Sequence, residues 1–246
     1  MLENKVIMLV GASGGIGSAL AKKADKYGAK TVLIARNKEN LEKLAATLQH
    51  GKVMVADATN LQEMQDVAKQ IYQEYGRIDV LIHAVGNIVL RPLHTLSEEI
   101  FRDSLEINLL SAFFAMKAAV KYMLKKKKGS VVGISSVAAK KGMRNHAAIS
   151  ATKSGLEGLI RSAAVTYAKK GIRFNAVALG LIDTPLAKRN NLTTNEKAIE
   201  ISNNMHPLGR FGTTNDVVDQ ILLLASDNSS WTTGAIIPID GGLSIA

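Results

Sequence analysis

A cluster of glycines near the start of the chain is the residue pattern best suited to chemistry. An apolar, strand-like run over 6–10 is followed at once by Gly11-Ala12-Ser13-Gly14-Gly15-Ile16-Gly17, and a helix-like segment comes next. Glycines let backbone N–H groups approach a pyrophosphate closely, and the N-terminus of the following helix offers it partial positive charge. The pattern therefore predicts a dinucleotide-binding turn with contacts from Gly11, Ser13, Gly15, Ile16 and Gly17.

The end of the second strand-like run indicates which dinucleotide this turn holds. An NAD site usually has an acidic residue here, which binds the 2′-hydroxyl of the adenosine ribose. This sequence has Ala35 followed by Arg36 instead. An arginine suits a 2′-phosphate, so the sequence favours NADP(H) as the cofactor. The alternative is that Arg36 is simply an exposed residue at a strand end.

Composition restricts the other classes of function. The chain of 246 residues has no cysteine, which excludes disulfides and cysteine-ligated metals, and we predict no metal site. The first apolar run is far too short to span a membrane, so we expect a soluble, cytoplasmic protein. Aromatic residues are only 4% and no nucleic-acid-binding motif is present. We therefore expect neither nucleic acid nor a membrane as a partner.

The net charge of +10 has two interpretations. The first is general solubility, with lysines on solvated faces and at helix ends. The second is a docking surface for an acidic carrier or substrate. Two basic runs, 125–128 and 169–170, each close a helix-like segment. On the second interpretation they form one basic patch near the mouth of the substrate pocket.

The elements that must position these residues alternate along the whole chain. Short apolar runs typical of buried strands are separated by longer amphipathic segments typical of helices. We predict strands at 6–10, 31–35, 52–56, 80–84, 130–134, 173–178 and 235–239, and helices at 15–27, 38–49, 61–75, 101–126, 151–169 and 214–225. This alternation predicts an α/β protein. It is a single-domain Rossmann fold over 1–246, with a doubly wound parallel sheet of about seven strands and helices on both faces.

One segment, 183–215, interrupts this rhythm. It is polar, contains two of the four prolines and directly follows a strand end, where ligands of open α/β sheets bind. We interpret it as a lid over the substrate, and the alternative is a plain surface excursion. Its apolar residues suggest a greasy or acyl-like ligand, although core packing explains them equally well. These residues are Leu186, Leu192, Ile199, Ile201 and Met205.

With these motifs in place, the chain resembles the short-chain dehydrogenase/reductase family along nearly its whole length. The details are closest to the branch that includes 3-oxoacyl-carrier-protein reductases. Beyond the glycine turn, the residues that match the family's pattern are Asp57-Ala58, Gly86, Asn108, Ser136, Lys153, Ile182, Thr184 and Asp240-Gly241-Gly242. Two stretches depart from it: His83-Ala84-Val85 stands where the family has Asn-Asn-Ala, and Leu179 stands where it has proline.

The resemblance implies roles for the matching residues. Asp57 and Ala58 would contact the adenine, and Gly86 would lie beside the cofactor. Ile182 and Thr184 would hold the nicotinamide carboxamide. Ser136, Lys153 and Asn108 would be catalytic, and Lys153 would also bind the nicotinamide ribose. The implied function is an NADP(H)-dependent oxidoreductase that reduces a carbonyl of a small-molecule or acyl-carrier-linked substrate.

The family's proton donor is missing. The family has Tyr-x-x-x-Lys, and here the residue four before Lys153 is Ile149. The family's serine-to-tyrosine spacing, counted from Ser136, also arrives at Ile149, so no shift of register restores the tyrosine. Isoleucine has no proton to give, and loss of a general acid typically costs about 10²–10⁴-fold in rate.

Three accounts of this position remain open. His146 lies on the same helical face as Ile149 and Lys153 and would supply the proton, although a surface or helix-start histidine is the competing interpretation. Alternatively, a water held by Asn108, Ser136 and Lys153 protonates the product, or the substrate is a conjugated enone that needs no strong acid. On the third account the protein is no enzyme but a catalytically silent NADP(H)-binding sensor, or the non-catalytic subunit of a mixed oligomer.

We also predict a homo-oligomer, most simply a tetramer. The predicted helices 101–126 and 151–169 carry small and apolar residues, and the family pairs these helices across a two-fold axis. The residues that motivate this prediction are Ala112, Phe113, Ala115, Met116 and Ala119 on the first helix, and Leu156, Leu159, Ile160 and Ala163 on the second.

Overall fold

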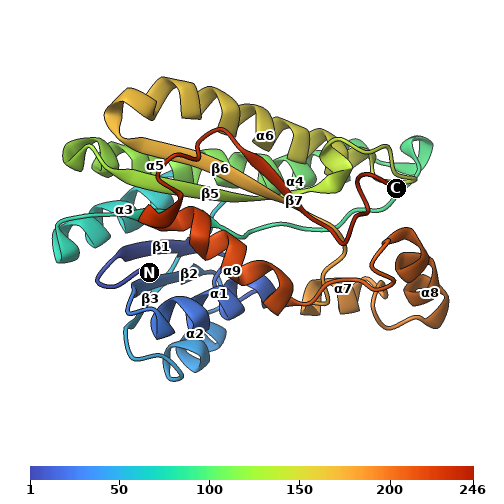
Figure 1. Ribbon diagram of the computed structural model, residues 1–246, viewed down its shortest axis with the longest axis horizontal. Coiled ribbons are helices and arrows are strands. Elements are labelled where there is room, and N and C mark those ends of the chain that lie inside the picture. Colours follow the sequence, from blue (N-terminus) through green and yellow to red (C-terminus); the bar gives the residue numbers. More distant parts are fainter.

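The computed structural model describes residues 1–246 and is built around one sheet of seven parallel strands (Figure 1). The strands are β1 (Val6–Val10), β2 (Lys30–Ala35), β3 (Gly51–Val55), β4 (Val80–His83), β5 (Gly129–Ser136), β6 (Ile172–Leu179) and β7 (Ile236–Ile239). Their order is β3-β2-β1-β4-β5-β6-β7. The direction of winding reverses between β1 and β4, where a crevice opens at the carboxyl ends of the strands. The predicted fold class is confirmed.

Helices cover both faces of this sheet because its strands alternate buried side chains between two cores. The helices are α1 (Gly15–Lys26), α2 (Lys38–Ala45), α3 (Leu61–Tyr75), α4 (Glu98–Leu105), α5 (Ser111–Lys126), α6 (Ala147–Tyr167), α7 (Pro185–Arg189), α8 (Glu196–Met205) and α9 (Thr214–Ala225). Val6, Met8 and Val10 of β1 join a core with α3, α5 and α6, whereas Ile7 and Leu9 join a core with α1, α2 and α9.

Two helices differ from the predicted bounds in ways that bear on the site. The helical run expected from residue 101 begins at Glu98, because the Ser97 hydroxyl caps it by accepting from the Ile100 N–H at 3.3 Å. A π-helical turn, Glu106–Leu110, then separates α4 from α5 and carries Asn108 inward, as such turns often do at functional sites. The helix expected from residue 151 begins at Ala147, one turn earlier.

The continuous run Glu98–Lys126 is long and apolar enough, by length and composition alone, to cross a membrane. In this fold 56% of its most apolar window is buried. Ala112, Ala115 and Met123 lie within the core shared with α3 and α6. Packing inside the protein therefore accounts for its apolar composition.

The two lysine runs lie together, but not where we expected them. Lys128 immediately precedes β5 and Lys170 nearly adjoins β6, and Gly129 at the start of β5 donates to the Gly171 carbonyl at 3.1 Å. Both runs therefore lie at the amino ends of the strands, opposite the edge where ligands bind. The prediction that they flank the pocket mouth is wrong, because a helix that ends before a parallel strand must deliver its C-terminus to that strand's amino end.

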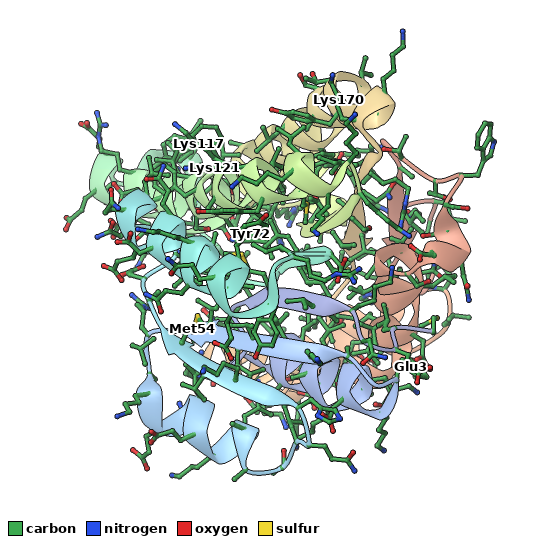
Figure 2. The ribbon with its side chains drawn as sticks, turned by 90° about the vertical axis from the view of Figure 1, so that its left-hand side faces the viewer. Glu3, Met54, Tyr72, Lys117, Lys121 and Lys170 are labelled. Atoms are coloured by element: carbon green, nitrogen blue, oxygen red, sulfur yellow. The ribbon has the colours of Figure 1, made fainter.

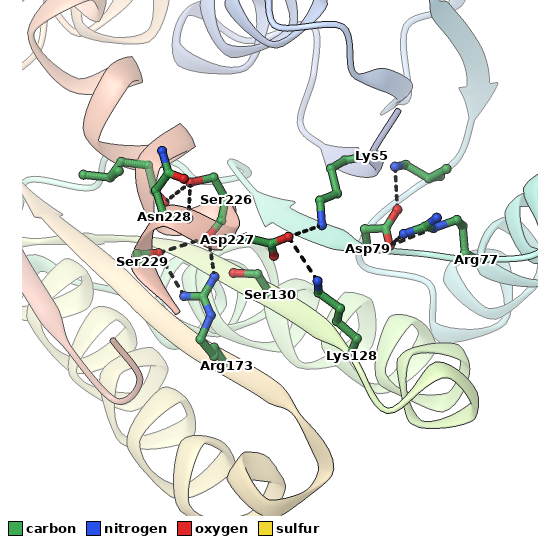
Figure 3. A network of polar contacts seen from close by, with 12 residues as sticks. Lys5, Arg77, Asp79, Lys128, Ser130, Arg173, Ser226, Asp227, Asn228 and Ser229 are labelled. Carbon is green, nitrogen blue, oxygen red and sulfur yellow. Dashed lines mark hydrogen bonds and ion pairs between the residues drawn. The ribbon is translucent and has the colours of Figure 1, made fainter. Parts of the chain in front are cut away.

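Part of this lysine cluster is already engaged by neighbouring groups. Asp227 accepts from Lys5 at 2.8 Å and from Lys128 at 3.0 Å, and Arg173 donates nearby to the carbonyl of Ser226 at 2.8 Å (Figure 3). Two further lysines, Lys117 and Lys121, project from α5 near Tyr72 of α3 (Figure 2).

The helix faces that motivated the oligomer prediction are largely internal. Ala112, Ala115 and Ala119 of α5 and Leu156 and Ile160 of α6 are all buried in the core. Their small size reflects close helix–sheet packing within one chain. Of the residues that motivated the prediction, Phe113 remains exposed, and Leu124 and Val165 are further exposed apolar residues on α5 and α6.

Candidate functional site

A cavity of about 720 Å³ opens at the carboxyl ends of the central strands. It runs from the glycine turn past the ends of β4, β5 and β6 to α7 and α8. Among its lining residues are Asn108, Ser136, His146, Ile149 and Lys153, which are predicted site residues from three separate segments of the sequence. The fold thus brings together the predicted catalytic residues and the position without a tyrosine.

Three glycine positions of the turn, Gly11, Gly15 and Gly17, have no room for a side chain. Gly11 has φ of +88°, and a Cβ at Gly17 would lie 2.2 Å from the Gly11 carbonyl oxygen. A Cβ at Gly15 would lie 2.9 Å from Cβ of Thr184, so this glycine also keeps a gap between α1 and the start of α7. No side chain caps the N-terminus of α1 and no acidic residue lies in its first turn. These features suit a bound pyrophosphate.

Arg36 and Asp57 stand at the carboxyl ends of β2 and β3, beside the glycine turn. The Arg36 guanidinium is 77% exposed and lies 3.9 Å from the Asp57 carboxylate. The Thr59 N–H at 2.9 Å and its hydroxyl at 2.8 Å hold that carboxylate. The pKa of Asp57 is lowered, because these bonds and Arg36 together outweigh its partial burial, which acts in the opposite direction. The exposed Arg36 side chain therefore lies next to an anchored carboxylate, and Ala58, which follows Asp57 in the chain, is buried.

Lys153 is the buried charge of the site. Its Nζ donates to the Ile134 carbonyl at 2.8 Å, and its relative exposure is 7%. Burial lowers the pKa of Lys153 to about 8. A Cβ at Gly86 would lie 3.5 Å from this Nζ and 3.0 Å from Oδ1 of Asn108. Gly86 thus leaves the floor of the cavity open beside both side chains.

Both polar atoms of the Asn108 side chain form hydrogen bonds within the protein. Its Oδ1 accepts from the Asn87 N–H at 3.1 Å, and its Nδ2 donates to the Asn87 side chain at 2.5 Å and to the Ser104 carbonyl at 3.1 Å. It therefore ties the π-helical turn to the loop after β4. Its side chain positions the segment around Gly86 rather than reaching freely into the cavity.

The two serines that end β5 have different surroundings. Ser135 is buried and donates to Oε1 of Glu157 at 2.9 Å. Ser136 accepts from the Ala138 N–H at 3.2 Å, which leaves its own O–H free to donate into the cavity. Adjacent residues in a strand point to opposite faces, and although both serines line the cavity, only the Ser136 hydroxyl has its proton available to a ligand.

The start of α6 places His146 and Ile149 on the cavity wall. His146 is the N-cap residue of α6, and its Nδ1 donates to the Arg144 carbonyl at 2.5 Å. That bond leaves Nε2 as its free ring nitrogen. Ile149 is 6% exposed and lies between His146 and Lys153 on the same face of the helix.

Residues of the 183–215 segment form the outer wall. Ile182 and Thr184 line the cavity, and the Thr184 hydroxyl caps α7 by accepting from the Ala187 N–H at 3.2 Å. The segment is not an irregular loop, because it contains α7 and α8. Of its apolar residues, Leu186, Leu192, Ile201 and Met205 line the cavity. Ile199 does not.

Two buried histidines near the site were not assigned a role from the sequence. His83 ends β4, and its Nε2 donates to the Ser111 hydroxyl at 2.9 Å, since that hydroxyl gives its own proton to the Ile107 carbonyl. Burial and the nearby charge of Lys153 lower the pKa of His83 to about 3, so it is neutral. His206 follows α8 and lines the cavity. Only its place within the predicted lid, 183–215, signalled this in the sequence.

Comparisons with known proteins agree with this architecture. Residues 11–244 match the family described as enoyl-(acyl carrier protein) reductase. The chain is 38% identical to a 3-oxoacyl-[acyl-carrier-protein] reductase of Thermotoga maritima, across 99% of each chain. A levodione reductase structure superimposes with a TM-score of 0.95 at 28% identity, covering 100% of both chains. An actinorhodin polyketide ketoreductase solved with NADPH gives 0.92 at 25% identity, again covering 100% of both.

Proposed function

Because the chain belongs to the short-chain dehydrogenase/reductase family, we propose that it is an NADP(H)-dependent oxidoreductase that works without the family's catalytic tyrosine. Its substrate would be a carbonyl compound, or a conjugated enone, of small or acyl type. The observation that carries this proposal is the cavity that unites Ser136, Lys153 and Ile149 beside the glycine turn. The family's oxidoreductases use nicotinamide cofactors, and the choice of NADP(H) rests on Arg36.

The residues around the cleft suit such a cofactor. The turn Gly11–Gly17 has the tight glycine packing that a pyrophosphate needs, and Ser13 lies within it. Arg36 would bind the 2′-phosphate, and Asp57 and Ala58 the adenine. Lys153 would bind the nicotinamide ribose, with Ile182 and Thr184 near the carboxamide. A reduced nicotinamide bound here supplies a hydride.

The chain's own groups would then prepare a carbonyl for that hydride. Ser136 has a free O–H to donate to the carbonyl oxygen, because its hydroxyl accepts from the Ala138 N–H and donates to no group of the protein. The Lys153 ammonium, buried and fixed on Ile134, stabilises negative charge that develops on the same oxygen. Asn108 keeps the floor of the site in place through Asn87.

Ile149 cannot supply the final proton, so the alkoxide must receive it from elsewhere. Two sources are available on the cavity wall. His146 lies one helical turn from Ile149 and has Nε2 free, and in its imidazolium form it would give the Nε2 proton to the alkoxide while Nδ1 keeps its bond to the Arg144 carbonyl. The other source is solvent held by Ser136 and Lys153. Reduction of a conjugated C=C bond would not need a strong proton donor at position 149.

The outer wall indicates the kind of substrate. Leu186, Leu192, Ile201 and Met205 make the lid side of the cavity apolar. We propose that 183–215 closes over an aliphatic or acyl chain, in keeping with relatives that are named for acyl-carrier-protein substrates. Closure would exclude water from the reacting carbon.

The experiment that tests this function is NADPH oxidation by the purified protein against a panel of ketones, acyl thioesters and enones. We expect turnover of at least one class, and Ser136→Ala should reduce that turnover by roughly 10²-fold. If NADPH binds but no member of the panel is reduced, the silent-sensor reading replaces the enzymatic one.

A further inference from the structure

A second cavity adjoins the first on the side of α6. It has a volume of about 360 Å³ and lies between the loop that ends at Arg91 and the loop that enters α6. The two cavities share wall residues, among them Met143, Arg144 and His146, so they lie side by side at the loop that enters α6. A group bound in the second cavity would therefore lie next to the substrate pocket.

The side chains with a full charge that line the two cavities are all basic. Arg91 and Arg144 line the second cavity, and Arg144 and Arg189 line the first. No aspartate or glutamate lines either one. The protein has nine arginines, and these three are the ones without a protein partner for their guanidinium. Arg36, Arg77, Arg102, Arg161 and Arg210 each pair with a carboxylate, and Arg173 donates to backbone carbonyls.

The backbone holds two of these arginines in place. The Arg91 N–H donates to the Asn145 carbonyl at 2.9 Å, which joins the two loops. Asn145 has φ of +65°, a left-handed conformation that non-glycine residues adopt at a cost. His146 donates from Nδ1 to the Arg144 carbonyl at 2.5 Å. The loops are therefore fixed, while the guanidinium groups of Arg91 and Arg144 remain exposed to a ligand.

We propose that the substrate carries an anionic group, a carboxylate or a phosphate, that Arg91 and Arg144 bind in the second cavity, while Arg189 adds positive charge to the adjoining first cavity. This rests on the proposed function and names the chemistry of its substrate. An arginine fork matches either anion in two-point geometry. The apolar residues of 183–215 that line the first cavity would accommodate the chain that joins the anion to the reacting carbonyl.

Calorimetry tests the anion subsite without requiring turnover. The probes are a medium-chain oxo fatty acid and its methyl ester, each titrated into the NADPH-bound protein. We expect the acid to bind more tightly, and the double variant Arg91→Gln with Arg144→Gln to weaken it by about tenfold while the ester is unaffected. High salt should weaken only the acid.

A matched control keeps the result specific. Arg102→Gln removes an arginine of α4 that pairs with Glu98 and lines neither cavity, and it should leave both affinities unchanged. NADPH affinity should be the same in all variants, because the cofactor's phosphates belong at the glycine turn. Equal binding of acid and ester, or equal losses in the Arg102 and Arg91/Arg144 variants, would overturn the proposal.

A second pair of probes distinguishes the two sources of the anion. The same oxoacyl chain is presented as a pantetheine thioester with and without its phosphate. If the subsite serves a carrier arm, the phosphate should improve kcat/KM in the natural protein and not in the double variant. If it serves a free acid, the oxo fatty acid should show that dependence instead. If turnover depends on neither anion, the proposed oxidoreductase function is retained and the proposed anion subsite is wrong.

Discussion

Ile149 sits on the cavity wall between His146 and Lys153, where a single substitution has a direct chemical consequence. We predict that Ile149→Tyr raises turnover of simple ketones by roughly one to a few orders of magnitude, the worth of one general acid. Lys153 and Ser136 would lower the new phenol's pKa and polarise the carbonyl. Steady-state kinetics gives the comparison, and thermal unfolding checks that the larger ring does not overpack the site.

Comparing His146→Ala in the natural protein and in the Ile149→Tyr variant distinguishes the two possible proton donors. If His146 is the donor, His146→Ala should abolish activity in the natural protein and matter little once the tyrosine is present. If water is the donor, the change should be mild in both. A folded, NADPH-binding Ile149→Tyr protein that still reduces nothing would remove the reductase assignment.

Lys153 gives the site a pH dependence. Burial lowers the pKa of Lys153 to about 8 in the free protein, and an anionic cofactor binds its charged form better. Above pH 8 the lysine must regain a proton on binding, so NADPH affinity should fall as pH rises, by up to about tenfold per pH unit. Calorimetry between neutral and alkaline pH measures this. Lys153→Met should flatten the profile; an unchanged slope in that variant would assign the effect to another group.

Arg36 determines the predicted choice between the two nicotinamide cofactors. With its guanidinium exposed beside Asp57, it should favour NADPH over NADH by about tenfold, or roughly 1.4 kcal/mol. Arg36→Asp should reverse the preference. Lys38→Asp, which changes an exposed charge two residues away that pairs with Glu42, serves as the control. Equal affinity of the natural protein for both cofactors would refute the role of Arg36.

At the scale of elements, α1 and α6 offer a matched pair of glycines. A Cβ at Gly17 in α1 would lie 2.2 Å from the Gly11 carbonyl, whereas one at Gly158 in α6 would meet nothing within 4 Å. Gly17→Ala should therefore destabilise the fold by about 1–3 kcal/mol and abolish NADPH binding. Gly158→Ala should instead stabilise it by about 0.5–1 kcal/mol through helix propensity. Denaturant unfolding and NADPH titration measure both. Loss of cofactor binding in the two variants alike would show that the turn is not the critical element.

At the scale of the whole molecule, exposed apolar side chains predict association. Val165 on α6 is 83% exposed, and Trp231, between α9 and β7, is 100% exposed. If each of these side chains packs against a second copy at its own two-fold axis, the two interfaces together generate a tetramer. Sedimentation should show a tetramer for the natural protein and smaller species for Val165→Glu or Trp231→Glu. A monomer at micromolar concentration would contradict this.

Much of the architecture followed from periodicity alone. A parallel strand buried on both faces must be a short apolar run, so β1, β4 and β6 were visible in the sequence, and alternation with amphipathic segments required a doubly wound sheet. The glycine turn was visible for a related reason, because close backbone approach admits one residue type. Ser136 and Lys153 were identified through family resemblance rather than from spacing.

What only the tertiary structure decided concerns side chains whose roles depend on distant neighbours. Ala112 and Leu156 were expected on an outer face, but helix periodicity does not tell which neighbour covers an apolar stripe, and both are in the core. The lysine runs were placed at the wrong end of the sheet. Arg91 and Arg144 carried no signal in the sequence, because an unpaired arginine is recognised only once every carboxylate has a position in space.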